Sequence, residues 1–206
     1  MKKVIGICGL IGHGKDTAAG FLIEEGFQRI SFAGVLKDAC ANVFQWDRIL
    51  LEGNTPESRV WRETVDEWWV ERLSIPNFTP RLALQQVGTD VMRRHFHPDI
   101  WVAACERQIA MTEKNVVISD CRFFNELNVI KRLGGTTAVV WRDSEPEWWG
   151  SACKANIEHA PQLMETQYPS VHPSEWSWAG WNFDIELSNT STLEDFKSQT
   201  LQKIIE

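Results

Sequence analysis

The stretch Gly9-Leu10-Ile11-Gly12-His13-Gly14-Lys15-Asp16-Thr17 decides which fold this chain is expected to adopt. The apolar run Val4-Ile5-Gly6-Ile7-Cys8 precedes it and has the character of a short buried strand. Residues 18–23 follow it and have the character of the first turns of a helix. In this order of strand, glycine-rich turn and helix, the spacing G-x-x-x-x-G-K indicates a phosphate-binding loop.

The residue types of this loop suit the binding of phosphate. Glycines at positions 9, 12 and 14 allow successive backbone N–H groups to converge on phosphate oxygens, and the helix that follows adds its free N–H groups and its dipole. Lys15 adds a mobile cation for the terminal phosphates. Asp16 stands where Ser or Thr is usual, so the direct Mg²⁺ ligand is open, and Thr17 binding through water is one option. A glycine-rich turn with a surface lysine is the simpler alternative.

Composition restricts the class of protein. A length of 206 residues suggests one domain, and a net charge of −7 argues against broad adhesion to nucleic acid or to anionic lipid. The five cysteines form no C-x-x-C pair, which favours reduced thiols in a cytoplasm over disulfides or a zinc site. The chain begins with a strand of the fold, not a signal peptide, and no apolar run is long enough to span a bilayer. We therefore expect no stable nucleic-acid partner and no membrane.

Apolar runs alternate with helical patterns along the chain, which predicts an α/β fold with a parallel sheet. Strands are expected within residues 4–8, 26–32, 115–120, 136–141 and 183–187. Two segments interrupt this alternation. Residues 45–80 have no strand signature and are predicted to form a helical excursion, whereas residues 143–180, with four prolines and no sustained period, are predicted to form a lid-like or irregular region. Eleven tryptophans, many in polar surroundings, suggest half-exposed packing or base stacking.

The strand predicted at residues 115–120 ends in Asp120, and Cys121 and Arg122 follow it. The carboxyl end of a parallel strand is a typical place for functional residues. Asp120 can help to position Mg²⁺, and Arg122 can clamp a second anion. No Glu follows Asp120 to orient a hydrolytic water, so transfer to an acceptor is favoured over hydrolysis.

Several motifs, in order, resemble those of the bacteriophage-type deoxynucleoside monophosphate kinases, within the nucleoside monophosphate kinase group. They comprise Gly-His-Gly-Lys-Asp-Thr at 12–17, Phe-Ala-Gly-Val-Leu-Lys-Asp-Ala at 32–39, Leu-Gln-Gln-Val-Gly-Thr-Asp at 84–90, Asp-Cys-Arg-Phe-Phe-Asn-Glu at 120–126 and His-Pro-Ser-Glu at 172–175. Together they cover most of the chain. The resemblance implies a single three-layer P-loop kinase domain over residues 1–206, with a helical acceptor-binding insertion at 45–80 and a lid at 143–180.

The resemblance also implies the site. It assigns to ATP, the expected cofactor, the loop residues Gly12, Gly14, Lys15, Asp16 and Thr17. We also expect contacts to ATP from Gly9, His13 and Asn189, and from Arg142, which stands at the end of its predicted strand. Asp16 and Thr17 are the expected contacts to Mg²⁺, and Lys15, Asp120 and Arg122 the catalytic residues. Around the acceptor it places Lys37, Arg81, Gln85, Thr89, Asp90, Trp101, Arg122 and Glu126.

Alternatives remain at three of these positions. Gln85 and Trp101 either contact the acceptor or pack in the helical layer, and Glu126 either contacts it or orients Arg122. Trp148 and Trp149 are candidates to cover the site on closure. His172 and Glu175 belong to a motif whose role the sequence does not reveal.

The expected function is transfer of the γ-phosphate of ATP to a deoxynucleoside monophosphate. The alternatives are a P-loop kinase for another small acceptor and a nucleotide-dependent switch or ATPase. Base and sugar selectivity stay open, as does a homodimer. The expected location is the cytoplasm, that of the host cell if the chain is phage-encoded.

Overall fold

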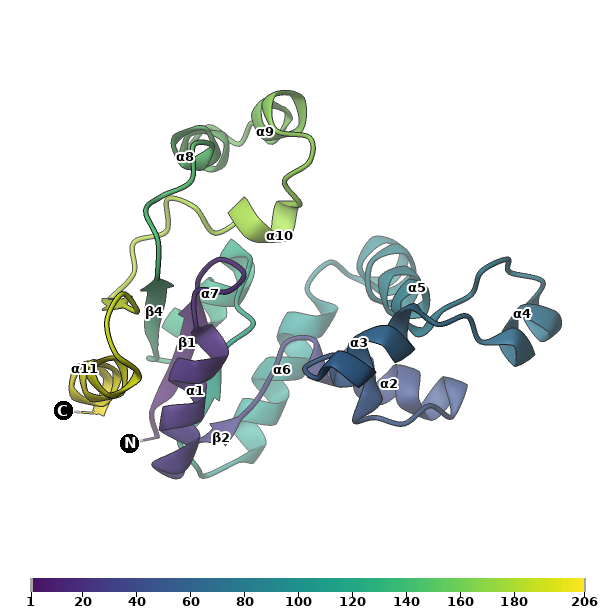
Figure 1. Ribbon diagram of the computed structural model, residues 1–206, viewed down its shortest axis with the longest axis horizontal. Coiled ribbons are helices and arrows are strands. Elements are labelled where there is room, and N and C mark those ends of the chain that lie inside the picture. Colours follow the sequence, from purple (N-terminus) through teal and green to yellow (C-terminus); the bar gives the residue numbers. More distant parts are fainter. Residues whose placement is uncertain (1, 206) are drawn as a thin grey trace. The chain divides into compact units, whose positions relative to one another are not determined.

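The computed structural model of the protein describes residues 2–205 and contains one five-stranded parallel sheet (Figure 1). Its strand order is β2-β3-β1-β4-β5, and all four pairings are parallel. The strands are β1 (Val4–Cys8), β2 (Gln28–Arg29), β3 (Val116–Ile118), β4 (Thr136–Trp141) and β5 (Ile185–Ser188). The predicted α/β class with a parallel sheet is therefore confirmed, although β2 and β3 are shorter than their apolar runs.

Helices cover both faces of this sheet. On one face, α1 (Lys15–Glu24) and α11 (Leu193–Ile205) pack against a cluster that includes Ile5, Ile7 and Leu22. Side chains alternate along a strand, so Gly6 faces the opposite side, where Ile130 of α7 (Phe124–Arg132) lies against it. The fold consequently has three layers, with β1 in the middle of the central one.

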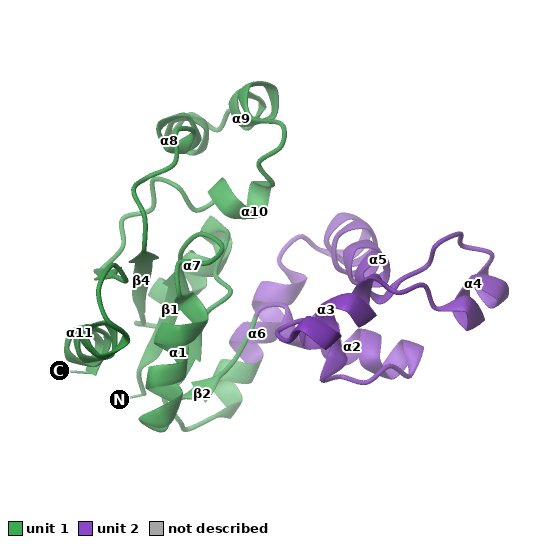
Figure 2. Ribbon diagram, viewed as in Figure 1, with its two compact units in different colours: residues 1–31, 108–206 green, residues 32–107 purple. Residues whose placement is uncertain are grey.

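The chain divides into two compact units, coloured separately in Figure 2. Residues 2–31 and 108–205 form the sheet unit, and residues 32–107 form what we call the helical unit. The helical unit contains α2 (Gly34–Phe44), the 3₁₀-helix η1 (Leu50–Glu52), α3 (Pro56–Glu63), α4 (Glu67–Leu73), α5 (Pro80–Gln85), the π-helix η2 (Gln86–Phe96) and the start of α6 (Ile100–Met111). The prediction that residues 45–80 are helical and lack strands is confirmed.

Local sequence explains how the helical unit is held together. The Thr79 hydroxyl caps α5 by accepting the Leu82 N–H at 3.1 Å, and Pro80 occupies the first turn. The ring of Phe44 lies 4.5 Å from that of Trp46 and 5.2 Å from that of Trp69. The tryptophans of this segment therefore pack with one another, although Trp68 is 55% exposed.

Of the two alternatives for residues 143–180, lid-like or irregular, the irregular one was wrong. These residues contain α8 (Trp149–Ile157), α9 (Gln162–Gln167) and α10 (Pro173–Trp176), which follow β4 in Figure 1. Helices of 9, 6 and 4 residues are too short for a helical period to show in the sequence.

Trp149 anchors this segment instead of covering a site. It is 9% exposed, and its ring lies 5.1 Å from that of Trp141 and 4.8 Å from that of Trp178. This burial corrects the suggestion that Trp149 is free to close over a ligand. Within residues 2–205, no helix is both long and apolar enough to cross a membrane.

Candidate active site

The glycine-rich turn between β1 and α1 has a backbone that excludes side chains at two positions. Gly14 has φ 103°, and a Cβ there would lie 2.5 Å from Asn189 Nδ2. Gly9 has φ 150°, and a Cβ there would lie 2.8 Å from the Val140 carbonyl oxygen. At Gly12, by contrast, a Cβ would meet no heavy atom within 4 Å. The turn is therefore held from behind and open at Gly12, which fits a cradle for an anion.

The first turn of α1 directly follows this cradle. Gly14 is the N-cap residue and has no side chain with which to satisfy the first N–H groups of the helix, so those groups suit a phosphate. Lys15 begins the helix, and its Nζ donates to the Leu10 carbonyl oxygen at 2.9 Å. Burial, and next the guanidinium of Arg122, lower the pKa of Lys15. Two cations thus lie close enough to repel each other beside the loop.

Three neighbours hold the back of the loop in place. His13 is 5% exposed, its Nδ1 accepts the Arg142 N–H at 3.3 Å, and its backbone oxygen accepts from Asn189 Nδ2 at 2.9 Å. The His13 ring also contacts the Trp141 ring edge-on at 5.7 Å. These contacts give His13, and with it Asn189 and the Arg142 backbone, a supporting role for the loop; the Arg142 side chain is exposed.

Polar side chains at and just after the carboxyl ends of β2 and β3 lie near Asp16 of α1. Asp16 Oδ1 accepts from Arg29 Nη2 at 2.5 Å and from Ser119 Oγ at 2.8 Å. Asp120 Oδ2 accepts from Ser31 Oγ at 2.7 Å. Sequence reasoning missed Arg29 and Ser119, although their places at the ends of adjacent parallel strands were a usable signal.

This group of oxygens fits Mg²⁺ better than a transition metal. Within residues 2–205, no three His, Cys, Asp or Glu side chains gather in a way that suits a metal ion. Mg²⁺ bound with a nucleotide usually takes one or two protein ligands and keeps several waters. Asp16 and Asp120 suit that arrangement, and the hydroxyl of Thr17 is exposed in the same turn of α1.

Arg122 belongs to the turn that precedes α7, and its side chain reaches the start of α10. Its Nη1 donates to Ser174 Oγ at 3.0 Å and lies 3.9 Å from Glu175 Oε1, with 44% of the side chain exposed. Its backbone N–H donates to Glu126 Oε2 at 2.8 Å, and the Phe123 N–H donates to the same oxygen at 3.2 Å. Glu126 is only 3% exposed. Of its two predicted roles, the orienting one matches these contacts.

The other predicted acceptor residues belong to the helical unit. Lys37 Nζ pairs with Glu52 Oε2 at 2.6 Å, and Arg81 Nη1 pairs with Glu63 Oε1 at 2.7 Å. Burial alone would raise the pKa of Glu52, but hydrogen bonds from Lys37 and Arg48 lower it, so the carboxylate stays ionised in this network.

Gln85 and Trp101 differ in burial. Trp101 is 4% exposed, and its Nε1 donates to the Gly88 carbonyl oxygen at 2.9 Å, so its ring is packed in this structure. Gln85 is exposed at the end of α5, and Thr89 and Asp90 are exposed one turn later on η2. Asp90 lies 3.7 Å from Arg94. Gln85, Thr89 and Asp90 thus present polar groups to solvent.

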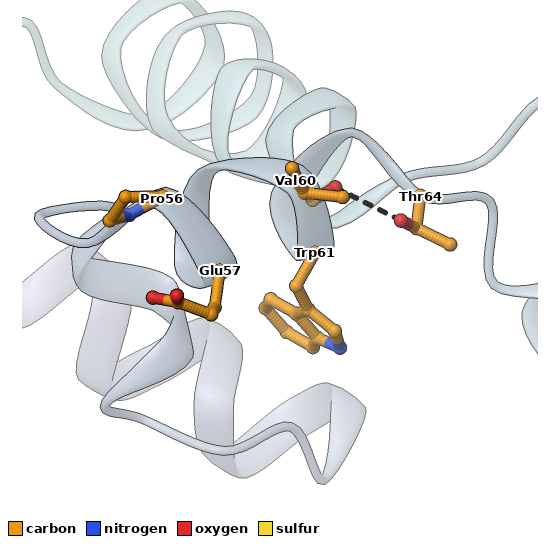
Figure 3. A pocket seen from close by; sticks show the side chains of 5 residues that line it. All are labelled: Pro56, Glu57, Val60, Trp61 and Thr64. Atoms are coloured by element: carbon orange, nitrogen blue, oxygen red, sulfur yellow. Dashed lines mark hydrogen bonds between the residues drawn. The ribbon is translucent and has the colours of Figure 1, made fainter.

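A hollow of about 550 Å³ lies on α3, lined by Pro56, Glu57, Val60, Trp61 and Thr64 (Figure 3). The Thr64 hydroxyl on its rim donates to the Val60 carbonyl oxygen at 2.9 Å. None of the residues that the sequence assigns to ATP or to the acceptor lines it. We therefore assign this hollow no part in the site.

Comparison with known proteins identifies the family. No protein-family model matches the chain. A protein of Acanthamoeba polyphaga mimivirus, provisionally named a deoxynucleotide monophosphate kinase, is 32% identical over 212 residues, covering 96% of this chain and 94% of its own.

Solved structures similar to this chain include two other kinases. Dephospho-CoA kinase from Campylobacter jejuni is 16% identical with a TM-score of 0.46, covering 98% of this chain and 95% of its own. Shikimate kinase from Bacteroides thetaiotaomicron is 12% identical with a TM-score of 0.38, covering 97% of each chain. The assignment depends on the viral relative, whose identity and coverage are sufficient: the chain belongs to the deoxynucleotide monophosphate kinase family and is a P-loop kinase.

Proposed function

We propose that the protein transfers the γ-phosphoryl group of ATP to a deoxynucleoside monophosphate, giving ADP and a deoxynucleoside diphosphate. The observation that supports this most directly is that two cations, Lys15 and Arg122, lie at the same edge of the sheet. Lys15 begins α1 at the phosphate loop. Arg122 is connected to the same loop through Glu175, whose Oε2 accepts the Ile11 N–H at 3.2 Å and whose Oε1 lies 3.9 Å from Arg122 Nη1. One cation suits the donor phosphates and the other an acceptor phosphate.

This arrangement requires no general base. The attacking oxygen of a nucleoside monophosphate is already largely ionised at neutral pH, because the second pKa of a phosphate monoester is about 6. The residues then need only to align two polyanions and to spread positive charge over the transferring group. The loop N–H groups and Lys15 hold the donor, and Arg122 orients the acceptor. Mg²⁺, when bound near Asp16 and Asp120, neutralises charge on the donor phosphates.

The remaining assignments follow from this proposal. We place the base and sugar of the acceptor against Gln85, Thr89 and Asp90, whose exposed polar groups suit hydrogen bonding. Lys37 and Arg81 are further cations for the acceptor phosphate. To reach it, Lys37 must break its ion pair with Glu52, and Arg81 must break its ion pair with Glu63. Residues 45–80 act as the acceptor-binding insertion and residues 143–180 as the lid, whose α10 already contacts Arg122.

A panel of ribo- and deoxyribonucleoside monophosphates, each tested with ATP and Mg²⁺, examines this function. We expect ADP formation that depends on the added deoxynucleotide, with the diphosphate product identified by mass. Arg122→Ala should lower kcat/KM for the acceptor by about 100-fold or more. The matched control is Arg107→Ala, because Arg107 is an exposed arginine on α6 with no assigned role.

Two outcomes would contradict the proposal. ATP consumption that ignores every monophosphate would point to an ATPase or switch. A phosphorylated product formed only from a different class of small molecule would point to another acceptor.

A further inference from the structure

Glu175 places a carboxylate between the phosphate loop and Arg122. Its Oε2 accepts the backbone N–H of Ile11 at 3.2 Å, and its Oε1 lies 3.9 Å from Arg122 Nη1. Only 18% of the Glu175 side chain is exposed, so this negative charge is partly withdrawn from water. One carboxylate thus contacts both partners that the proposed reaction assigns to phosphate groups.

The charges around Glu175 explain why it adopts this position. Burial and Arg122 both act against the protonated form of Lys15, whereas Glu175 and Asp16 act in its favour. Without an anion at this point, the ammonium of Lys15 and the guanidinium of Arg122 would repel each other in a partly desolvated site. Glu175 supplies that anion in this structure.

The segment before Glu175 fixes its direction. His172 caps the short helix α10, with its Nδ1 accepting the Ser174 N–H at 3.2 Å and lying 2.9 Å from Ser174 Oγ. The same Ser174 Oγ accepts from Arg122 Nη1 at 3.0 Å. Contacts at residues 172 and 174 therefore orient the next side chain toward the loop, and the His-Pro-Ser-Glu motif acquires a physical role.

We propose that Glu175 is a positioning residue that acts as the internal counter-anion of the phosphate loop and gives up this place to a nucleotide phosphate. A carboxylate carries one negative charge, whereas the phosphates of ATP carry several, so the nucleotide outcompetes it for the Ile11 N–H. The hydrogen bond from Arg122 to Ser174 persists when the phosphate replaces the Glu175 carboxylate. The inference rests on the proposed function only in that a phosphate of the nucleotide occupies the loop.

The sign of the effect distinguishes this role from a structural one. Loss of a purely structural contact leaves polyanion binding unchanged or weakens it. Loss of a competing charge strengthens it. Glu175→Gln keeps the shape of the side chain and removes its charge, so we expect ATP, ADP and pyrophosphate to bind about fivefold more tightly, as one nearby unit charge predicts.

Isothermal titration calorimetry with ATP, ADP and pyrophosphate, without any acceptor, tests the proposal. The matched control is Glu165→Gln, which removes the same charge from an exposed position on α9 and should leave all three affinities unchanged. Equal or weaker binding by Glu175→Gln than by the wild type overturns the proposal, as does equal tightening in the control. Because no turnover is measured, this result is independent of whether a deoxynucleoside monophosphate proves to be the acceptor.

A second measurement covers the case in which Glu175→Gln does not fold. In the wild-type protein, the backbone amide of Ile11 should show a large NMR shift change as pyrophosphate replaces the carboxylate. An Ile11 amide that does not move at saturating pyrophosphate overturns the proposal without any variant.

Discussion

The sheet unit and the helical unit use their charged side chains in different ways. In the sheet unit, charged groups from distant parts of the chain converge: Arg29 bonds to Asp16, and Glu175 contacts both Ile11 and Arg122. In the helical unit, the predicted cations Lys37 and Arg81 are each paired with a carboxylate of the same unit. The sheet unit thus brings Lys15, Arg122 and the carboxylate of Glu175 together beside the phosphate loop.

This difference corresponds to two requirements of a kinase. Stabilising a travelling phosphoryl group needs donors and cations that are in place before the reaction, which the sheet unit provides. Choosing an acceptor needs polar groups that exchange water or a weak partner for a substrate, and the exposed Gln85 and Asp90 have that character. We therefore expect substitutions in the sheet unit to affect turnover and those in the helical unit to affect selectivity.

The largest expected effect is that of Lys15→Ala. Removal of the ammonium beside the donor phosphates should lower kcat by about 100-fold or more, since it takes away a charge that stabilises the transition state. The control is Lys114→Ala, because Lys114 is an exposed lysine of the same unit outside the loop. Steady-state kinetics and the melting temperature of both variants separate lost catalysis from lost folding. A Lys15→Ala enzyme with near-normal kcat would remove the basis of the comparison.

A smaller effect is expected from Gln85→Ala in the helical unit. Loss of one hydrogen bond to the acceptor should raise its KM by about tenfold, equivalent to roughly 1.4 kcal/mol. The dissociation constant of ATP, measured by calorimetry, should not change. Gln202→Ala on α11 is the control, since Gln202 is also exposed on a helix. If Gln85→Ala instead lowered kcat with KM unchanged, the division of roles between the units would be wrong.

The sequence predicted those parts of the fold where a strong local signal agrees with the tertiary structure. The loop and its flanking β1 and α1 depend on residue types that few other conformations accept. The prediction of irregular structure at residues 143–180 failed because the helices of this segment are stabilised by tertiary packing. Trp149 and Trp178 bury each other, and no period along the chain shows that contact.

The site was predictable to a similar degree. Positions at strand ends, such as Asp120 and Arg122, followed from topology. The roles of Glu126 and Trp101 depended on where each side chain is buried, and burial is set by neighbours far along the chain. Glu175 shows this most clearly, because its partner Ile11 lies 164 residues away.

The smallest expected effect concerns hydrogen bonds that join α7, β4 and β5 in the sheet unit. Asp184, just before β5, accepts from Lys131 Nζ at 2.6 Å, from the Thr137 N–H at 2.7 Å and from the Thr137 hydroxyl at 2.9 Å. Although burial alone would raise it, hydrogen bonds from Lys131 and Thr137 lower the pKa of Asp184 below its ordinary value of 3.8. The ionised carboxylate therefore ties α7, β4 and β5 together.

Asp184→Asn should lower the free energy of unfolding by about 1 kcal/mol at pH 7, because the group is partly exposed and solvent screens the lost charge. A lowered folded-state pKa stabilises the protein above the unfolded pKa, and that stability is lost as the pH falls through the folded value. The difference between Asp184→Asn and the wild type in urea midpoint should thus be full at pH 7 and shrink below pH 3.8. Glu113→Gln, at an exposed position before β3, should show no such dependence. A difference that persists unchanged at low pH would mean that the shape of the Asp184 side chain, not its charge, joins the strands. The contacts of Asp184 would then not depend on charge in the way that the contacts of Arg122 and Glu175 do.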